Sequence, residues 1–172
     1  MRFTYCPDCG TKLTMKEIGD EGAMPYCESC KKPWWDMFSS CIIVLVYNDK
    51  GEVALLNQAY ISTKYRNLVS GYMKPGETAE STAVREVEEE IGIKIDRLTP
   101  VRTVWFKPKG LLMIGYLGHA SNTDFTTSPE VDHVEWVKAE DAVALVHPKS
   151  EASASAMLVE EYVKQLAVSS VQ

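Results

Sequence analysis

The segment 71–93 constrains this chain more than any other, because it joins a glycine- and proline-rich loop to a helix with an acidic stripe. Glu89 and Glu90 follow Glu86 by three and four positions, so the three side chains are expected to meet on one surface. Like charges at this spacing destabilise an isolated helix by about 0.2–0.5 kcal/mol per pair. A bound divalent cation would offset the repulsion, and magnesium and manganese prefer such oxygen ligands. An acidic face that is merely solvated is the alternative.

The apolar residues of this segment predict where the helix packs and where it begins and ends. One expected core face collects Ala83, Val84, Val87 and Ile91. At about 100° per residue, the three glutamates centre about 120° from that face, so we expect them to point away from the core. Thr78 is the expected N-cap, Glu80 suits the first turn, and Gly92 should end the helix.

The loop and the helix together show one continuous pattern. A glycine is followed after five residues by a glutamate, and after seven more by Arg-Glu-hydrophobic-any-Glu-Glu-any-Gly-hydrophobic. The positions are filled by Gly71, Glu77, Arg85, Glu86, Val87, Glu89, Glu90, Gly92 and Ile93. Arg85 is expected to pair with Glu89 on the helix and with Glu77 in the loop, which would lock the loop onto the helix. Gly71 can bring its backbone carbonyl close to a metal or a phosphate, because it has no side chain.

This pattern resembles the Nudix box, the signature of the Nudix hydrolases. The resemblance implies an α/β fold, an α/β/α sandwich with a mixed sheet. It also implies hydrolysis of the diphosphate in a nucleoside diphosphate linked to another moiety, with Mg²⁺ or Mn²⁺ as the catalytic metal. Glu86, Glu89 and Glu90 would be metal ligands together with Gly71, one glutamate assisting the water, and Arg85 would support them.

Two Cys-x-x-Cys motifs precede this domain. They are separated by seventeen residues and consist of Cys6, Cys9, Cys27 and Cys30. This spacing predicts a four-cysteine zinc site in a structural ribbon over residues 1–38; two disulfides or free thiols are the alternatives. Gly10 and Lys31 follow the two motifs and suit tight turns whose amides face the thiolates. Cys41 is left over and is expected to be a buried thiol at the start of the second domain, residues 39–172.

The remaining pattern predicts strands that alternate with helices. Expected strands are 41–47, 53–56, 67–70, 101–106, 111–117 and 131–137, and expected helices are 139–146 and 154–167. A turn at 48–51 and a hairpin around 107–110 connect neighbouring strands. Residues 33–38 are expected to be the linker between the two domains.

A zinc ribbon directly before a Nudix domain is similar to the NADH pyrophosphatase subgroup. That subgroup carries Ser-Gln-Pro-Trp-Pro-Phe-Pro-x-Ser-Leu-Met after the box, and the matching segment 102–113 keeps Trp105, Pro108 and Leu111 but not the remaining positions. By the resemblance, Glu130 completes the metal site or serves as the base; a plain loop carboxylate is the alternative. Trp105, Phe106 and Tyr72 are candidates to stack on a substrate ring, with core packing as the alternative.

Net charge and hydropathy limit the classes of molecule that this chain is expected to bind. The formal net charge of −6 argues against broad binding to a phosphate backbone, so the expected partner is a small dinucleotide or nucleoside diphosphate derivative. A capped RNA end is the exception that the resemblance allows. No apolar run reaches transmembrane length and no signal peptide is visible, so we expect a cytoplasmic protein without a membrane partner. The subgroup is dimeric, which implies a homodimer.

We therefore expect a metal-dependent hydrolase that cleaves the diphosphate of NAD(H). An ADP-ribose or FAD pyrophosphatase is the alternative within the family. A non-catalytic nucleotide-sensing Nudix module is the alternative outside enzymes, although such modules usually have a damaged box. A zinc-ribbon RNA binder with a scaffolding Nudix domain is a third reading, and the acidic balance of the chain counts against it.

Overall fold

The computed structural model describes residues 3–148 and 153–169. The chain divides into two compact units, Met1–Phe38 and Ser39–Gln172. Residues 149–152 and 170–172, which belong to the expected second domain, lie outside the described residues. No described helix combines the length and the apolar character needed to cross a membrane.

The first unit is a small antiparallel sheet with the order β1-β2-β3. Its elements are β1 (Thr14–Glu17), the short 3₁₀ helix η1 (Gly19–Glu21), β2 (Ala23–Cys27) and β3 (Lys32–Pro33). Most of its side chains are exposed, while Cys6 and Cys27 are fully buried. A unit with so little apolar burial needs another source of stability, and the buried cysteines point to a bound metal.

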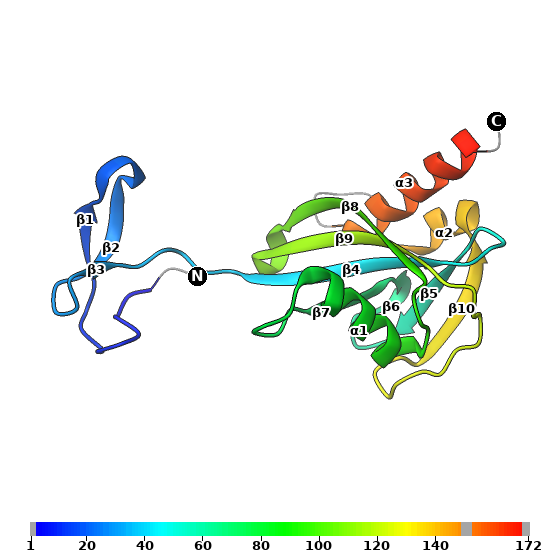
Figure 1. The fold of residues 1–172 in the computed structure, drawn as a ribbon, viewed down its shortest axis with the longest axis horizontal. Coiled ribbons are helices and arrows are strands. Elements are labelled where there is room, and N and C mark those ends of the chain that lie inside the picture. The colour runs from blue at the N-terminus through cyan, green and yellow to red at the C-terminus, as the bar shows by residue number, and fades with distance from the viewer. Residues whose placement is uncertain (1–2, 149–152, 170–172) are drawn as a thin grey trace. The chain divides into compact units, whose positions relative to one another are not determined.

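The second unit is built on a seven-stranded mixed sheet (Figure 1). Its main path is β10-β5-β4-β9-β8, with β6 added to β5 and β7 added to β4. The strands are β4 (Ser39–Tyr47), β5 (Glu52–Gln58), β6 (Ser62–Asn67), β7 (Val69–Tyr72), β8 (Arg97–Phe106), β9 (Leu111–His119) and β10 (His133–Lys138). The β4–β9 pair is parallel and the other pairs are antiparallel, so the predicted mixed sheet is confirmed.

Helices cover both faces of this sheet, which confirms the α/β/α sandwich. The helices are α1 (Ala79–Ile91), α2 (Ala139–Leu145) and α3 (Ala154–Ser169); η2 (Lys107–Lys109) lies at the tip of the β8–β9 hairpin. Along β4, Ile42, Val44 and Val46 pack on the α1 side, and Cys41, Ile43 and Leu45 pack on the side of α2 and α3. Burial on both faces explains why this strand is an unbroken apolar run in the sequence.

Most predicted elements are confirmed, with differences at two places. Strand β6 was not predicted, because the sequence Ser-Thr-Lys-Tyr-Arg-Asn lacks the apolar alternation of a strand. Val84, expected on the core face of α1, is instead 40% exposed, whereas Ala83, Val87 and Ile91 are fully buried. Cys41 is a buried thiol as expected, and burial raises its pKa to about 11.

Candidate active site

Helix α1 carries the glutamates and has the ends that the sequence predicted. The side chain of Thr78 accepts a hydrogen bond from the amide of Ser81, and the side chain of Ser81 accepts one from the amide of Thr78. Gly92 ends the helix in the left-handed conformation with φ of 69°. The caps set where the helix begins and ends, and the burial of Ala83, Val87 and Ile91 sets which of its faces meets the sheet.

Glu86 lies directly over Gly71 of strand β7. A Cβ atom built on Gly71 would fall 2.0 Å from Cδ of Glu86 and 2.1 Å from its Oε1 atom. Any side chain at position 71 would therefore displace this carboxylate. The requirement for glycine in the pattern is thus the room that it leaves for Glu86.

Arg85 connects the loop, the helix and the acidic residues. Its Nε and Nη2 atoms donate to the two carboxylate oxygens of Glu77 at 2.6 and 2.9 Å, which confirms the predicted bidentate pair. Its Nη1 atom donates to Glu86 at 2.7 Å and to Glu89 at 2.9 Å, and Nη2 also donates to the carbonyl of Tyr72 at 3.3 Å. These carboxylates raise the pKa of Arg85, so the guanidinium stays charged.

Glu77 has further partners that keep it ionised. The amide of Lys74 donates to its Oε2 atom at 2.8 Å, and the hydroxyl of Thr82 donates to the same oxygen at 2.9 Å. The hydrogen bond from Arg85, followed by that from Lys74, lowers the pKa of Glu77 to about 2. The loop from Gly71 to Thr78 is therefore held on α1 by a carboxylate that stays charged at any physiological pH.

Glu90 differs from the other two glutamates because it is buried. Only 7% of this residue is exposed, and the side-chain amide of Gln58, itself buried, donates to its Oε2 atom at 3.4 Å. Burial, and then the charges of Glu86 and Glu130, raise the pKa of Glu90 to about 8. The charges of Glu86 and Glu130 thus act on the buried Glu90 and disfavour its ionised form, an arrangement that a divalent cation would relieve.

The expectation that the three helical glutamates meet on one surface is only partly met. Glu89 is 55% exposed at its side chain and bonds to Arg85, while the side chain of Glu86 is 14% exposed and Glu90 is buried. The three do not form a tight ligand set: in the described part of the chain, the group whose ligand atoms all lie within 4.8 Å of one another is the four cysteines. Glu130, in the connection between β9 and β10, is a further carboxylate whose charge acts on Glu90.

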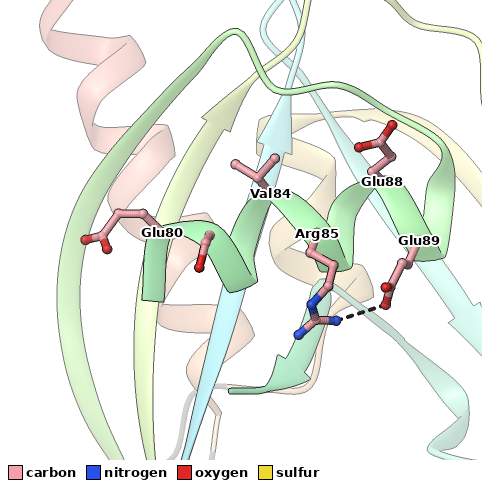
Figure 2. A pocket seen from close by; sticks show the side chains of 6 residues that line it. Glu80, Val84, Arg85, Glu88 and Glu89 are labelled. Carbon is pink, nitrogen blue, oxygen red and sulfur yellow. Dashed lines mark hydrogen bonds and ion pairs between the residues drawn. The ribbon is translucent and has the colours of Figure 1, made fainter. Parts of the chain in front are cut away.

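An open depression of about 660 Å³ lies over the outer face of α1. It is lined by Glu80, Ser81, Val84, Arg85, Glu88 and Glu89. Figure 2 shows Val84 and Glu88 pointing away from the Arg85–Glu89 pair. Neither Glu86 nor Glu90 lines this depression, so we place the candidate metal site at Gly71 and the inner side of α1.

The three candidate stacking residues occupy different surroundings. Trp105 is 50% exposed and Tyr72 is 51% exposed, whereas Phe106 packs against the core beneath α2 and α3. Tyr72 is paired with Cys41, whose side chain faces α2 and α3, so Tyr72 lies on that side of the sheet. A role in binding substrate stays a prediction for each of them.

The four cysteines of the first unit could hold a metal ion, because their sulfur atoms all lie within 4.8 Å of one another. The sulfur atoms of Cys9 and Cys27 lie 3.5 Å apart, and those of Cys6 and Cys30 lie 3.9 Å apart. Four sulfurs placed tetrahedrally at 2.3 Å from zinc would be separated by about 3.8 Å. The cysteines are free, which excludes the disulfide alternative in this structure. Gly10 and Lys31 have φ of 71° and 56°, as the tight turns after both motifs require.

Comparison with known proteins decides the family. A model of the NUDIX domain matches residues 37–159, which is more than half of the chain. The chain belongs to the Nudix domain family. Members of this family generally use divalent metals, in agreement with the acidic site of this Nudix domain.

Curated relatives of this Nudix protein include two bacterial NAD-capped RNA hydrolases called NudC. The protein from Escherichia coli O9:H4 (strain HS) is 31% identical over 150 residues, covering 84% of this chain and 55% of the relative. The protein from Pseudomonas putida (strain GB-1) is 28% identical over 138 residues, covering 80% of this chain and 49% of the relative. The chain thus spans about half the length of the curated relatives it matches.

Solved structures show the same fold at low sequence identity. A Nudix hydrolase from Nitrosomonas europaea superposes with a TM-score of 0.67 at 16% identity, covering 92% of both chains. The Nudix domain of NrtR from Shewanella oneidensis, complexed with ADP ribose, superposes with a TM-score of 0.63 at 15% identity, covering 82% of this chain and 94% of that chain.

Two residues near Glu90 were missed by the sequence reasoning. Gln58 ends strand β5, and its amide lies 3.4 Å from both Glu90 and the hydroxyl of Tyr60. The charges of Glu90 and Glu130 contribute to a raised pKa of Tyr60, after the effect of burial. A polar residue at the end of an apolar strand was the available signal, but the register that brings it to α1 cannot be read from one sequence.

Proposed function

We propose that this Nudix domain hydrolyses the diphosphate of NAD(H), giving a mononucleotide and AMP. The observation that carries the proposal is the carboxylate of Glu86 seated over Gly71, with the charges of Glu86 and Glu130 acting on the buried Glu90, in a chain whose box is complete. The names of the relatives support NAD-linked substrates, including a capped RNA end. ADP-ribose and FAD are the competing substrates within the family.

The acidic residues would hold the metal on the inner side of α1. Glu86, Glu90 and Glu130, with the carbonyl of Gly71, supply hard oxygen ligands of the kind that Mg²⁺ and Mn²⁺ prefer. The fit rests on the Glu86 carboxylate, which lies over Gly71, and on the negative charges that act on Glu90. When bound, the metal would neutralise phosphate oxygens and lower the pKa of a bound water.

The protein residues would orient the substrate and move one proton. A carboxylate of the site, with Glu130 as our assignment, accepts the proton of the water as its oxygen forms a bond to phosphorus. The bond between that phosphorus and the bridging oxygen breaks, and the bridging oxygen leaves with the other phosphate. Arg85 keeps the loop and Glu86 in place, while Glu89, exposed and bonded to Arg85, remains our proposed additional ligand.

The proposal is tested by turnover of a substrate panel. We expect NADH hydrolysis that requires Mg²⁺ or Mn²⁺, with lower kcat/KM for ADP-ribose and FAD. Glu86→Gln should reduce kcat by about 100-fold or more without loss of fold, because it removes a charged ligand. Glu88→Gln is the matched control, since Glu88 lies on the same helix but points outward.

Two results would count against this assignment. Wild-type turnover in Glu86→Gln would remove the carboxylate from the mechanism. Tight binding of NADH or ADP-ribose with no hydrolysis under any metal would favour the nucleotide-sensing alternative. The homodimer stays a proposal, to be tested by measuring the mass of the protein in solution.

We also propose that the first unit holds a structural Zn²⁺ through Cys6, Cys9, Cys27 and Cys30. Support comes from the tetrahedral spacing of the sulfur atoms and from the small apolar core of this unit. Metal analysis of purified protein should give one zinc per chain. A zinc-free protein with an unchanged ribbon would contradict the proposal.

A further inference from the structure

The segment 120–132 joins β9 to β10 without regular secondary structure, yet it is tied to the end of α1. The amide of Thr126 donates to the carbonyl of Ile91 at 3.0 Å, and the amide of Ser128 donates to the carbonyl of Glu90 at 3.0 Å. Carbonyls in the last turn of a helix have no partner within the helix. The segment therefore docks on α1 by donating hydrogen bonds to carbonyl groups that have no partner within the helix.

Gly92 makes this close approach possible. A Cβ atom on Gly92 would lie 2.7 Å from Cβ of Thr126 and 2.9 Å from its carbonyl oxygen. Real Cβ atoms do not come so close to other atoms, and the carbonyl belongs to the backbone, so the segment itself would have to move. The glycine in the box is thus needed for the contact with Thr126 as well as for its left-handed φ of 69°.

Glu130 lies just beyond this docking point. Its amide donates to the hydroxyl oxygen of Ser128 at 3.3 Å, and the next residue, Val131, is buried in the core. Two residues after Glu130, the carboxylate of Asp132 accepts a hydrogen bond from the amide of Ala59 at 2.7 Å. Glu130 is therefore held between two fixed points, although its own side chain is exposed.

We infer that Gly92 is a positioning residue, which fixes Glu130 at the C-terminal end of α1 through the docking of residues 126–128 on this helix. The inference rests on the proposed function, because the position of Glu130 matters to turnover only if Glu130 serves the hydrolytic site. It assigns a catalytic consequence to a glycine that touches neither metal nor substrate.

The test compares Gly92→Ala with Gly51→Ala. Gly51 also has a left-handed φ, 75°, but a Cβ there meets only ordinary contacts at 3.7 Å with Leu166. Both variants therefore carry the backbone strain, and only Gly92→Ala displaces residues near Thr126. For NADH with Mg²⁺, we expect kcat of Gly92→Ala to be about 10–100-fold below that of Gly51→Ala, with similar KM, because small misplacements of a catalytic group have effects of this size.

A double-mutant cycle with Glu130→Gln separates this inference from the proposed function. If Gly92 acts through Glu130, Gly92→Ala should lower kcat no further in the Glu130→Gln background. A reduction by the same factor in both backgrounds would overturn the inference and leave the role of Glu130 intact. Wild-type turnover of Glu130→Gln alone would remove Glu130 from the mechanism, and the inference with it.

A second variant keeps the test valid if Gly92→Ala does not fold. Ser128→Ala removes the hydroxyl that accepts from the amide of Glu130 and leaves the glycine in place. We expect a lower kcat in Ser128→Ala and recovery in Ser128→Thr, which keeps the hydroxyl. Unchanged turnover in Ser128→Ala would overturn the inference.

Discussion

Replacing Glu90 by glutamine should make the protein more stable when no divalent ion is present. In the folded protein the pKa of Glu90 is raised from 4.5 to about 8, first by burial and then by the charges of Glu86 and Glu130. The folded state therefore binds more protons than the unfolded state between these pH values, and the free energy of unfolding falls as pH rises through this window. Glutamine has the same shape and no charge to bury.

The size of the effect follows from the same pKa. Each tenfold change in proton affinity is worth about 1.4 kcal/mol. At pH 7 Glu90 is ionised in the unfolded chain but mostly protonated in the folded protein, which lowers the free energy of unfolding by about 3 kcal/mol. Above pH 8 the loss reaches about 5 kcal/mol, and at pH 4 it vanishes. Glu90→Gln should remove this loss and the pH dependence that goes with it.

The assay is urea denaturation of protein dialysed free of magnesium and manganese, at pH 4, 7 and 8.5. Glu88→Gln is the control, since Glu88 lies on the same helix and lines the outer depression. With Mg²⁺ at 100 times its dissociation constant, most of the difference at pH 7 should disappear, because the ion stabilises only the wild-type site, by about 2.7 kcal/mol. Equal stability of wild type and Glu90→Gln at pH 8.5 without metal would refute the reasoning, as would a difference that persists at pH 4.

Three further outcomes are expected. Gly71→Ala should weaken Mn²⁺ binding at least about tenfold in a titration followed by electron paramagnetic resonance, because its Cβ would occupy the place of the Glu86 carboxylate; unchanged affinity would contradict this. Cys27→Ser should release zinc and lower the melting temperature of the ribbon, and a variant that retains zinc would rule out the four-cysteine site. Arg85→Lys keeps the charge but loses the bidentate pair with Glu77, so we expect kcat to fall about tenfold and the loop to become sensitive to protease, whereas wild-type behaviour would show that the pair is dispensable.

The sequence was most informative where function depends on local spacing. The N-cap at Thr78, the end of α1 at Gly92 and the Arg85–Glu77 pair all follow from residues close together in the chain. Treating the three glutamates as one face, with a single mean direction, missed the burial of Glu90. This residue lies only about 20° around the helix axis from Ala83. That position places it within the core-facing side of α1.

Long-range contacts were beyond the sequence. The contact between Gln58 and Glu90 depends on the pairing of β5 with its neighbours and on the placement of α1 against the sheet. The docking of Thr126 at Gly92 joins residues far apart in the chain by backbone groups, which every residue carries and no composition reveals. Strand β6 forms because β5 offers it a partner, against its own polar composition.

The division of the Arg85 guanidinium between two tasks has a consequence for how an ion enters. Two of its nitrogens grip Glu77, and the third alone reaches Glu86 and Glu89. A cation that bound at the proposed site would therefore compete with one nitrogen of Arg85, and the pair of Arg85 with Glu77 would remain intact. In the absence of a cation, this nitrogen reduces the repulsion between the carboxylates of Glu86 and Glu89. The loop and α1 can therefore adopt their arrangement without a bound metal.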